Sequence, residues 1–290
     1  MRKSTLDYID EKIKELSAED RTKLDDRLIG LMVEDSAHKK LKYELDFGPD
    51  YIDEAMEMYN NFGKFQGMST GYKSLDTFTK GLVGGELVII GGATSGGKSS
   101  LALNIAGNVM KSGKSVLVVT LEMTKPQVIS RMMIADKNFL DYSANLVFQK
   151  HDEFSWEDID GIIENAKVNM NIDLVVVDHL HHFTRELRNT SEDIGRITKE
   201  FQKNAKRHKV PIILISHTRK GEGKGIDELR SSSYIAQDAD IVLMVYRDRD
   251  YPGKIGVAIE KNRNRGYDFD NNSVLLNFDR TRIYEDYEQY

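Results

Sequence analysis

One segment of the sequence has the residue types and the spacing that bind a phosphate group. It matches the pattern G-x-x-x-x-G-K-[ST]. Glycines let backbone N–H groups approach phosphate oxygens without a clash from a Cβ atom, while the lysine supplies positive charge and the hydroxyl group a ligand for Mg²⁺. The segment, together with the serine that follows it, consists of Gly92, Ala93, Thr94, Ser95, Gly96, Gly97, Lys98, Ser99 and Ser100.

The elements that flank this segment, which we call the phosphate-binding loop (residues 92–99), fit the same chemistry. An apolar run at residues 87–90 predicts a strand that enters the loop, and residues 99–109 predict a helix that leaves it. The amino end of a helix adds a partial positive charge. We therefore expect Lys98 to reach the β- and γ-phosphates of ATP and Ser99 to ligate Mg²⁺, in preference to a plain glycine-rich turn.

An acidic residue follows a second buried strand. Residues 174–177 are four consecutive apolar residues, and Asp178 comes directly after them. Sheets of α/β proteins bind ligands at the carboxyl ends of their strands. Many strands end in an aspartate, so this feature is weak by itself. Downstream of a phosphate-binding loop, it predicts that Asp178 holds Mg²⁺ directly or through water.

Two further predicted strands end near an ionisable side chain. Glu122 follows residues 116–121, where a carboxylate can orient and deprotonate an attacking water; the alternative is a solvated acid at a strand end. His217 follows the strand at residues 210–215 and is a candidate for contacting the γ-phosphate and responding to its loss. A single histidine at a strand end is more often structural, so both alternatives stay open on the residues by themselves.

Three histidines close to Asp178 raise the question of a further metal site: His179, His181 and His182. Their spacing fits no usual zinc pattern, and the chain has no cysteine that could supply a thiolate. We therefore interpret these histidines as solvent-facing or subunit-contact residues.

Positive charge is concentrated in three segments, at residues 203–209, 219–224 and 261–265. The first is interpreted as the solvated face of a helix and the second, which is rich in glycine, as a mobile loop. In the third, Lys261 and Arg263 follow a strand and are predicted to point away from their own phosphate-binding loop. They would then suit a phosphate on the adjacent subunit, as an arginine finger supplied in trans.

Composition limits the class of protein without selecting one. The 290 residues, 40% of them hydrophobic, suffice for one core and a small additional module. The lack of cysteine excludes disulfides, and no apolar run approaches the roughly 20 residues of a membrane span. The amino terminus does not resemble a signal peptide, so we expect a cytoplasmic protein with no membrane partner. Because the net charge is -6, the protein could bind nucleic acid only where its positive charge is concentrated locally.

The order of the elements that must position these residues indicates an α/β fold, a P-loop NTPase core with a central, mostly parallel sheet. Further strands are predicted at residues 241–246, 255–259 and 274–278, the last two antiparallel. Helices are predicted around residues 159–166 and 194–207.

Three parts are predicted along the chain: a small helical region at residues 1–48, a linker helix at residues 49–65, and the ATPase domain at residues 66–290. The linker helix carries an apolar stripe but has little core of its own. Its apolar face is expected to dock either on its own domain or on a neighbouring subunit.

Several segments together resemble the ATPase domain of DnaB-type replicative DNA helicases, which have a RecA-like core. The resemblance covers about residues 65–285. Its most specific part is the segment of residues 229–240, which ends in Gln237, Asp238, Ala239 and Asp240, because generic RecA-like ATPases share the loop and the acid but not this signature. The other matching segments are residues 70–76, 121–123, 177–180 and 261–264.

The resemblance implies a homo-oligomer, a hexameric ring with ATP between its subunits. The family hydrolyses NTP to translocate along single-stranded DNA from 5′ to 3′ in DNA replication, with a primase, polymerase or loader as candidate partners. Carried over by position, Glu122 activates water and Asp178 serves the metal. Lys261 and Arg263 become the trans-acting pair. The positions that align with the DNA-contacting loop are Arg230, Ser231 and Ser233.

Some positions depart from the family. His217 stands where DnaB itself has glutamine and looks more like the phage helicase-primases, and Ser231 replaces an acidic residue. The region before the linker is shorter than the DnaB collar and does not resemble it clearly. We expect a version from a phage or a mobile element, in a bacterial cell or a phage-infected host. The alternatives are a RecA- or KaiC-like DNA-binding ATPase without unwinding activity, and a non-catalytic interaction protein.

Overall fold

A computed structural model describes residues 52–60, 64, 67–150, 154–180, 183, 191–217, 237–247, 251–263 and 272–286. The chain divides into two compact units, Met1–Met58 and Tyr59–Tyr290. The helix expected near residue 52 is present as α3 (Ile52–Asn60). The second unit contains the sheet and the predicted site.

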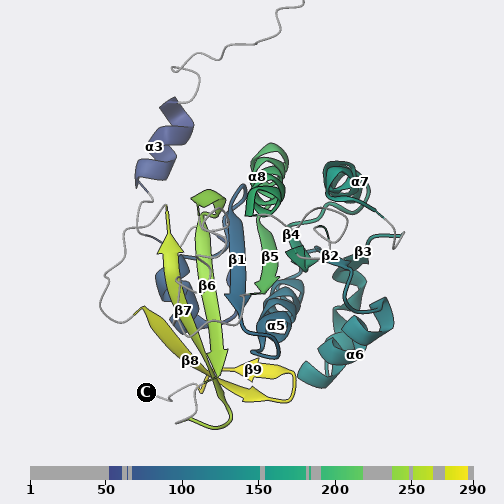
Figure 1. Ribbon diagram of the computed structural model, residues 1–290, viewed down its shortest axis with the longest axis vertical. Coiled ribbons are helices and arrows are strands. Elements are labelled where there is room, and N and C mark those ends of the chain that lie inside the picture. Colours follow the sequence, from purple (N-terminus) through teal and green to yellow (C-terminus); the bar gives the residue numbers. More distant parts are fainter. Residues whose placement is uncertain are drawn as a thin grey trace, which may run out of the picture. The chain divides into compact units, whose positions relative to one another are not determined.

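The described residues form a nine-stranded sheet with the order β3-β2-β4-β5-β1-β6-β7-β8-β9 (Figure 1). Strands β1 to β6 run parallel, and β7, β8 and β9 continue the sheet in antiparallel fashion. The strands are β1 (Leu87–Gly92), β2 (Val116–Thr120), β3 (Leu146–Phe148), β4 (Leu174–Asp178), β5 (Ile212–His217), β6 (Ile241–Arg247), β7 (Lys254–Asn262), β8 (Ser273–Asp279) and β9 (Arg282–Tyr284).

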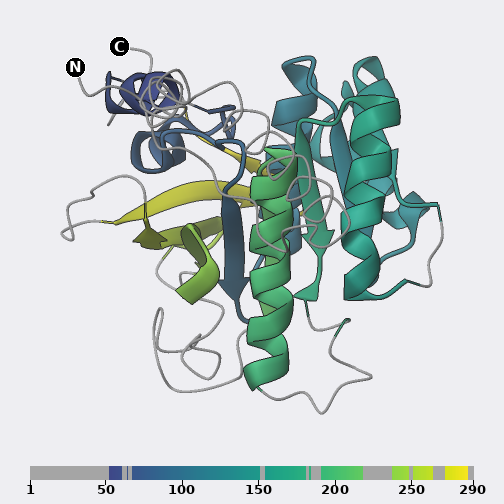
Figure 2. The ribbon, with the colours of Figure 1, turned by 90° about the horizontal axis from the view of Figure 1, so that it is seen from above.

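Helices cover both faces of the sheet, and α7 and α8 lie side by side on one of them (Figures 1 and 2). The α-helices of the second unit are α4 (Lys73–Thr79), α5 (Lys98–Lys111), α6 (Lys125–Ala135), α7 (Ile159–Met170) and α8 (Ser191–His208). Short 3-10 helices are η2 (Phe139–Asp141), η3 (Ser143–Asn145) and η4 (Trp156–Asp158).

Two hydrophobic cores form because successive side chains of a strand point to opposite faces. In β1, Val88 and Ile90 pack with α5 and α6, whereas Leu87 and Ile89 pack with α7 and α8. The central strands are buried on both faces, which explains why they read as unbroken apolar runs in the sequence. The predicted α/β fold with its mostly parallel sheet is confirmed, as are the antiparallel strands near the carboxyl terminus.

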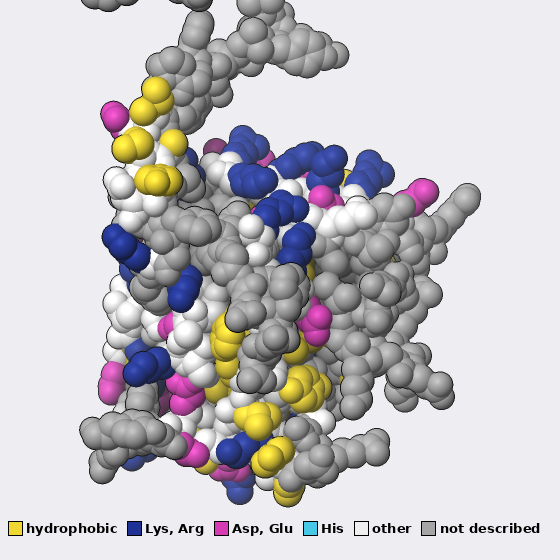
Figure 3. Space-filling view, turned by 90° about the vertical axis from the view of Figure 1, so that its left-hand side faces the viewer, with side chains coloured by type: hydrophobic (Ala, Val, Ile, Leu, Met, Phe, Trp, Pro, Cys, Tyr) yellow, Lys and Arg dark blue, Asp and Glu magenta, His cyan; other side chains and the backbone are white. Residues whose placement is uncertain are grey.

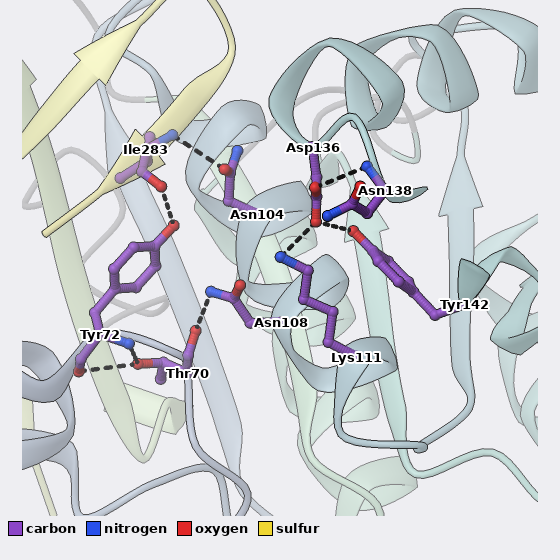
Figure 4. A network of polar contacts seen from close by, with 9 residues as sticks. All are labelled: Thr70, Tyr72, Asn104, Asn108, Lys111, Asp136, Asn138, Tyr142 and Ile283. Carbon is purple, nitrogen blue, oxygen red and sulfur yellow. Dashed lines mark hydrogen bonds and ion pairs between the residues drawn. The ribbon is translucent and has the colours of Figure 1, made fainter. Parts of the chain in front are cut away.

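Helix α5, which follows the phosphate-binding loop, is fixed by a network of polar contacts (Figure 4). Asn108 donates a hydrogen bond to the carbonyl of Thr70 at 2.9 Å, and the Tyr72 hydroxyl donates one to the carbonyl of Ile283 at 3.2 Å. Asn104 accepts a hydrogen bond from the Ile283 N–H at 3.0 Å. The start of the second unit and its last strand are therefore tied to the helix that presents Lys98.

A second part of this network lies where α5 and α6 end (Figure 4). Asp136 forms an ion pair with Lys111 and accepts a hydrogen bond from the Tyr142 hydroxyl at 2.6 Å. These contacts join the carboxyl-terminal end of α5 to the segment that follows α6. Among the described residues, no helix is both long and apolar enough to cross a membrane.

Candidate functional site

The strand register brings the phosphate-binding loop, Glu122, Asp178 and His217 to one edge of the sheet. Gly92 at the end of β1 pairs with His217 at the end of β5, and Thr120 at the end of β2 pairs with Asp178 at the end of β4. Glu122 follows β2 by two residues. We call this the carboxyl edge. It combines the phosphate-binding loop, two carboxylates and an imidazole, which the sequence places far apart.

The phosphate-binding loop takes a backbone conformation that requires glycine at particular points. Gly92 has a φ of 145°, and a Cβ atom there would lie 2.3 Å from the carbonyl oxygen of Val245. Gly97 has a φ of 107° and precedes the first residue of α5. These glycines allow the backbone to curve tightly between β1 and α5. The cradle they leave fits the phosphates of a nucleotide.

Lys98, the first residue of α5, is only 3% exposed. Its Nζ donates a hydrogen bond to the carbonyl of Ala93 at 2.8 Å, so the ammonium group is held within the phosphate-binding loop. Burial lowers the pKa of Lys98, while the nearby carboxylates of Asp178 and Glu122 oppose that shift. The side chain is a buried cation whose hydrogen bond goes to an uncharged carbonyl, which charged phosphate oxygens can replace.

Asp178 is 2% exposed, and neither of its carboxylate oxygens accepts a hydrogen bond of normal geometry from the described residues. Burial raises the pKa of this carboxyl to about 6, although the nearby Ser99 hydroxyl acts in the opposite direction. A buried carboxylate with two unsatisfied oxygens is costly unless a ligand binds it. The pair of Ser99 and Asp178 offers oxygen donors, which Mg²⁺ prefers, so the site fits the expected metal.

Glu122, His179 and His217 lie together beside this pair. The Nε2 atom of His179 is 3.5 Å from a carboxylate oxygen of Glu122, and its ring meets that of His217 edge to face with centroids 4.3 Å apart. His179 is 8% exposed. The interpretation of His179 as solvent-facing is therefore wrong, because its ring is buried and packs against that of His217, whereas a subunit contact stays a prediction. His181 and His182 lie outside the described residues.

Lys261 and Arg263 lie at the opposite edge of the sheet, which we call the amino edge. β7 runs antiparallel to β6, so Lys261 pairs with Val242 near the start of β6, and β6 in turn starts beside Val88 of β1. The length of β1 separates them from the carboxyl edge, a span of roughly 15 Å at 3.3 Å per residue. Both side chains lie away from the phosphate-binding loop of their own chain.

The amino edge holds these cations through its own polar groups. Lys261 Nζ and Arg263 Nη2 donate hydrogen bonds to the carbonyl of Gln237, at 3.0 and 2.7 Å. Arg263 Nη1 is 3.3 Å from Asp240, whose other carboxylate oxygen accepts a hydrogen bond from the Leu87 N–H at 3.0 Å. Burial and then the charge of Arg263 lower the pKa of Lys261.

Positive charge is also visible on the surface near this edge. Figure 3 shows Lys and Arg side chains gathered toward the top of the face it displays, and the amino edge lies at the top of Figure 1. The basic segment at residues 203–209 lies on and just after α8. There, Lys203 pairs with Glu200 and Arg207 with Asp160, each with its basic side chain more than 60% exposed. These two side chains lie on a solvated face, as expected.

Sequence reasoning left two residues without a role. His179 was misinterpreted although it directly follows Asp178, a position that already places it at the carboxyl edge. Asp240 was part of a family signature but had no assigned function, and its structural signal is an acidic residue directly before the buried run of β6. The three positions expected to contact DNA lie outside the described residues: Arg230, Ser231 and Ser233.

Comparison with known protein families gives a match over most of the chain. The model of the family described as "DnaB-like helicase C terminal domain" matches residues 67–143 and 138–281. The replicative DNA helicase DnaC of Bacillus subtilis is 29% identical over 254 residues, which is 73% of this chain and 55% of that protein. A probable replicative DNA helicase of Trieres chinensis is 32% identical over 227 residues, 64% of this chain and 48% of that protein. The chain spans about half the length of these relatives.

Solved structures show the same fold. One of them, a separately solved ATPase domain, superposes with a TM-score of 0.71 at 22% identity and covers 82% of this chain and 99% of its own. A DnaB-like replicative helicase, studied with its primase interactions, gives a TM-score of 0.70 at 20% identity over 87% of this chain and 71% of its own. RadB recombinase gives 0.55 at 22% identity, over 75% of this chain and 99% of its own. The second unit thus has the RecA-like ATPase fold.

Proposed function

The chain belongs to the family of DnaB-like helicase C-terminal domains, and from that premise we propose that it is an ATP-dependent replicative DNA helicase. It acts as a homo-oligomer, a hexameric ring that hydrolyses NTP between subunits. It moves along single-stranded DNA from 5′ to 3′ and unwinds the duplex. The observation that carries the proposal is the division of charged groups between two edges of one sheet, which suits a site shared by neighbouring subunits.

Nucleotide is held at the carboxyl edge. Backbone N–H groups of the phosphate-binding loop and of the adjacent Ser100 surround the phosphates, and Lys98 exchanges the Ala93 carbonyl for phosphate oxygens. Ser99 and Asp178 hold Mg²⁺, directly or through water. Bound Mg²⁺ would neutralise negative charge on the phosphates. Asp178 supports this assignment because its two buried oxygens accept no hydrogen bond of normal geometry from the described residues and lie near the Ser99 hydroxyl.

Glu122 is the candidate base that orients water and takes its proton. Its side chain is 46% exposed, which leaves it accessible to water, and the 3.5 Å contact with His179 restrains one carboxylate oxygen. His217 ends β5 next to the phosphate-binding loop, a position suited to a group that responds to loss of the γ-phosphate. The alternative of a purely structural histidine predicts that a His217→Ala variant, which has no polar group to contact a phosphate, keeps full DNA-stimulated turnover.

Lys261 and Arg263 are the candidate trans-acting pair. A ring built from head-to-tail contacts places one surface of a subunit against a different surface of the next. The amino edge of one copy can thereby face the carboxyl edge of another, with its cations next to the γ-phosphate. To act there, Arg263 gives up its contacts with Gln237 and Asp240. An arginine supplied in this way stabilises transition-state charge.

The remaining assignments follow the family without structural support of their own. Arg230, Ser231 and Ser233 form the DNA-contacting loop, which repeats around the ring and contacts backbone phosphates. A primase, polymerase or loader is a candidate partner. Residues 1–48 form a small helical region and residues 49–65 the linker helix before the ATPase domain. The protein acts in the cytoplasm of a bacterial cell or a phage-infected host.

The experiment that tests this function compares wild type with Lys98→Ala in two assays. Wild type should hydrolyse ATP faster with single-stranded DNA and displace a labelled strand from a forked duplex. Lys98→Ala should lose at least about 100-fold in turnover, because it removes a buried cation that meets developing charge, and should displace no strand. Lys203→Ala on the exposed face of α8 is the matched control and should keep both activities.

Each outcome distinguishes one function from the others. Strand displacement by Lys98→Ala would overturn the proposal. DNA-stimulated turnover without displacement in wild type would favour a RecA- or KaiC-like ATPase, an interpretation compatible with the fold likeness to RadB. Absence of turnover on single-stranded DNA would favour a non-catalytic interaction protein.

A further inference from the structure

Three potential metal ligands converge at the carboxyl edge from three different segments. Glu122 follows β2, His179 follows β4, and His217 ends β5. One ligand atom from each lies within 4.8 Å of the other two. The sequence does not show this grouping, since the residues are 57 and 38 positions apart, counted from their numbers. Parallel pairing of β2, β4 and β5 brings them together.

The donor set differs chemically from the expected Mg²⁺ site. Mg²⁺ is a hard ion that takes oxygen ligands, as Ser99 and Asp178 supply. Two imidazoles and one carboxylate suit borderline transition metals such as Zn²⁺ and Co²⁺ instead. Three protein ligands with an open fourth position are the usual arrangement of a zinc site that still binds water or a substrate oxygen.

One of the three distances between ligand atoms is close to what such an ion requires, and all three are within 4.8 Å. Tetrahedral bonds of about 2.0–2.1 Å separate neighbouring ligand atoms by roughly 3.3 Å. The contact between His179 and Glu122, at 3.5 Å, is already near that span. The side chain of Glu122 is 46% exposed and can move by rotation, whereas His179 is buried against the sheet. The site therefore combines a fixed imidazole with a carboxylate that can adjust.

We propose that Glu122, His179 and His217 bind a transition-metal dication of the Zn²⁺ class, at a position beside the Mg²⁺ ligands and separate from them. Metal binding by these three residues is inferred from their positions in the structure and does not require the proposed helicase function. A consequence rests on the proposed function: a carboxylate of Glu122 bound to Zn²⁺ no longer takes a proton from water. Zn²⁺ then inhibits ATP hydrolysis by occupying the proposed base rather than by displacing Mg²⁺.

Metal binding is tested on the full chain, without an affinity tag and without nucleotide. Zn²⁺ binding is measured by calorimetry, and Co²⁺ serves as a spectroscopic probe because its visible absorption reports imidazole and carboxylate coordination. Wild type should bind one ion with both probes. Glu122→Gln and His217→Gln should each bind at least about tenfold more weakly, a loss that changes even outside the ligand shell commonly cause.

The matched control is the double variant His181→Asn, His182→Asn, which removes two neighbouring imidazoles that the proposal does not use. It should bind Zn²⁺ like wild type. Unchanged affinity in both Glu122→Gln and His217→Gln would overturn the site, as would a loss confined to the double variant. Circular dichroism and thermal unfolding check each fold, and Glu122, being exposed, is the substitution least expected to disturb it.

Inhibition is tested separately, so that it fails independently of the proposed function. ATP turnover is measured at saturating Mg²⁺ with and without Zn²⁺, and each protein is compared with itself. Wild type should lose most of its turnover in Zn²⁺, and whatever turnover His217→Gln has should be at least about tenfold less sensitive. Equal sensitivity in the two proteins would overturn this mode of inhibition. No turnover before Zn²⁺ is added would overturn the proposed function but leave the binding result standing.

Discussion

The two edges of one sheet use buried aspartates in opposite ways. At the carboxyl edge, Asp178 is 2% exposed, and neither oxygen accepts a hydrogen bond of normal geometry from the described residues, although the Ser99 hydroxyl lies nearby. At the amino edge, Asp240 is 4% exposed, accepts a hydrogen bond from the Leu87 N–H and pairs with Arg263. Burial of an unsatisfied carboxylate costs free energy, whereas a satisfied one joins elements. The carboxyl edge is therefore suited to binding a ligand, whereas the buried carboxylate at the amino edge already has its partners within the chain.

One chain therefore carries two unlike halves of the proposed site. The half with the phosphate-binding loop has a buried cation whose hydrogen bond goes to a neutral group, because Lys98 donates to the backbone carbonyl of Ala93. The half with Lys261 and Arg263 is engaged in its own structure through Gln237 and Asp240. Substitutions in the half with the phosphate-binding loop should change ATP turnover more than the free energy of unfolding. Substitutions in the half with Lys261 and Arg263 should change both quantities.

The largest expected effect is that of Arg263→Ala on turnover. If Arg263 completes the site of the next subunit, turnover on single-stranded DNA should fall about 10³-fold or more, because a trans-acting arginine contributes that much. Binding of a fluorescent nucleotide should persist, since the phosphate-binding loop lies at the other edge. A steady-state ATPase assay and a nucleotide titration measure the two quantities.

A mixing experiment separates this role from a structural one. Subunits of Arg263→Ala retain an intact phosphate-binding loop, and subunits of Lys98→Ala retain Arg263, so mixed rings contain some complete interfaces. Turnover of the mixture should exceed that of either variant. Arg263→Lys is the matched substitution: it keeps the charge but not the planar fork, and should recover little activity. Full activity of Arg263→Ala would show that the amino edge contributes no catalytic arginine to the site of the next subunit.

A stability effect of intermediate size is expected from Asp240→Ala. The substitution leaves the Leu87 N–H buried without a partner and removes the carboxylate that faces Arg263. The free energy of unfolding should fall by about 2–4 kcal/mol. Urea denaturation of the nucleotide-free chain measures it.

Asp178→Ala is the matched test at the other edge. Burial disfavours the charged carboxylate of Asp178 more than the nearby Ser99 hydroxyl and the charge of Lys98 favour it, so its removal should leave the stability of the nucleotide-free chain unchanged or raise it by up to about 2 kcal/mol. Two aspartates of similar burial would then differ in the sign of their effect. An equal loss of stability in both variants would show that the edges do not differ as described.

Much of the arrangement at the carboxyl edge could be predicted from the sequence. The central strands are apolar runs whose ends were predicted within about two residues, a common margin for element boundaries, so Glu122, Asp178 and His217 were correctly expected at strand ends. What stayed hidden depends on contacts between distant segments. His179 is buried because its ring meets His217 of the neighbouring strand, and Asp240 is satisfied by Leu87, 153 residues earlier.

The helices and strands that the sequence did not predict divide into one with a local signal in the sequence and three without such a signal. Helix α6 had a usable signal, because Thr124 and Gln127 form a capping box with a proline in its first turn. Helix α4 has no side chain of its own at its cap; the N–H groups of Lys73 and Ser74 donate to Glu285 at 2.6 and 2.8 Å. Strands β3 and β9 have three residues each, too few for a period-2 pattern.

The smallest expected effect lies where α5 and α6 end, outside the proposed site. Burial raises the pKa of Asp136, but the hydrogen bonds from Lys111 and Tyr142 outweigh this and hold it at about 2. Because the folded pKa is depressed, the stability that this carboxylate adds is complete above its ordinary value of 3.8 and is lost as pH falls toward 2. Asp136→Asn should lower the free energy of unfolding by about 1 kcal/mol at pH 7, since Lys111 is half-exposed and solvent screens the pair. Urea titrations should show this difference narrowing between pH 4 and pH 3, with DNA-stimulated turnover at neutral pH unchanged; a constant difference would mean that the network in Figure 4 stabilises the chain without its charge.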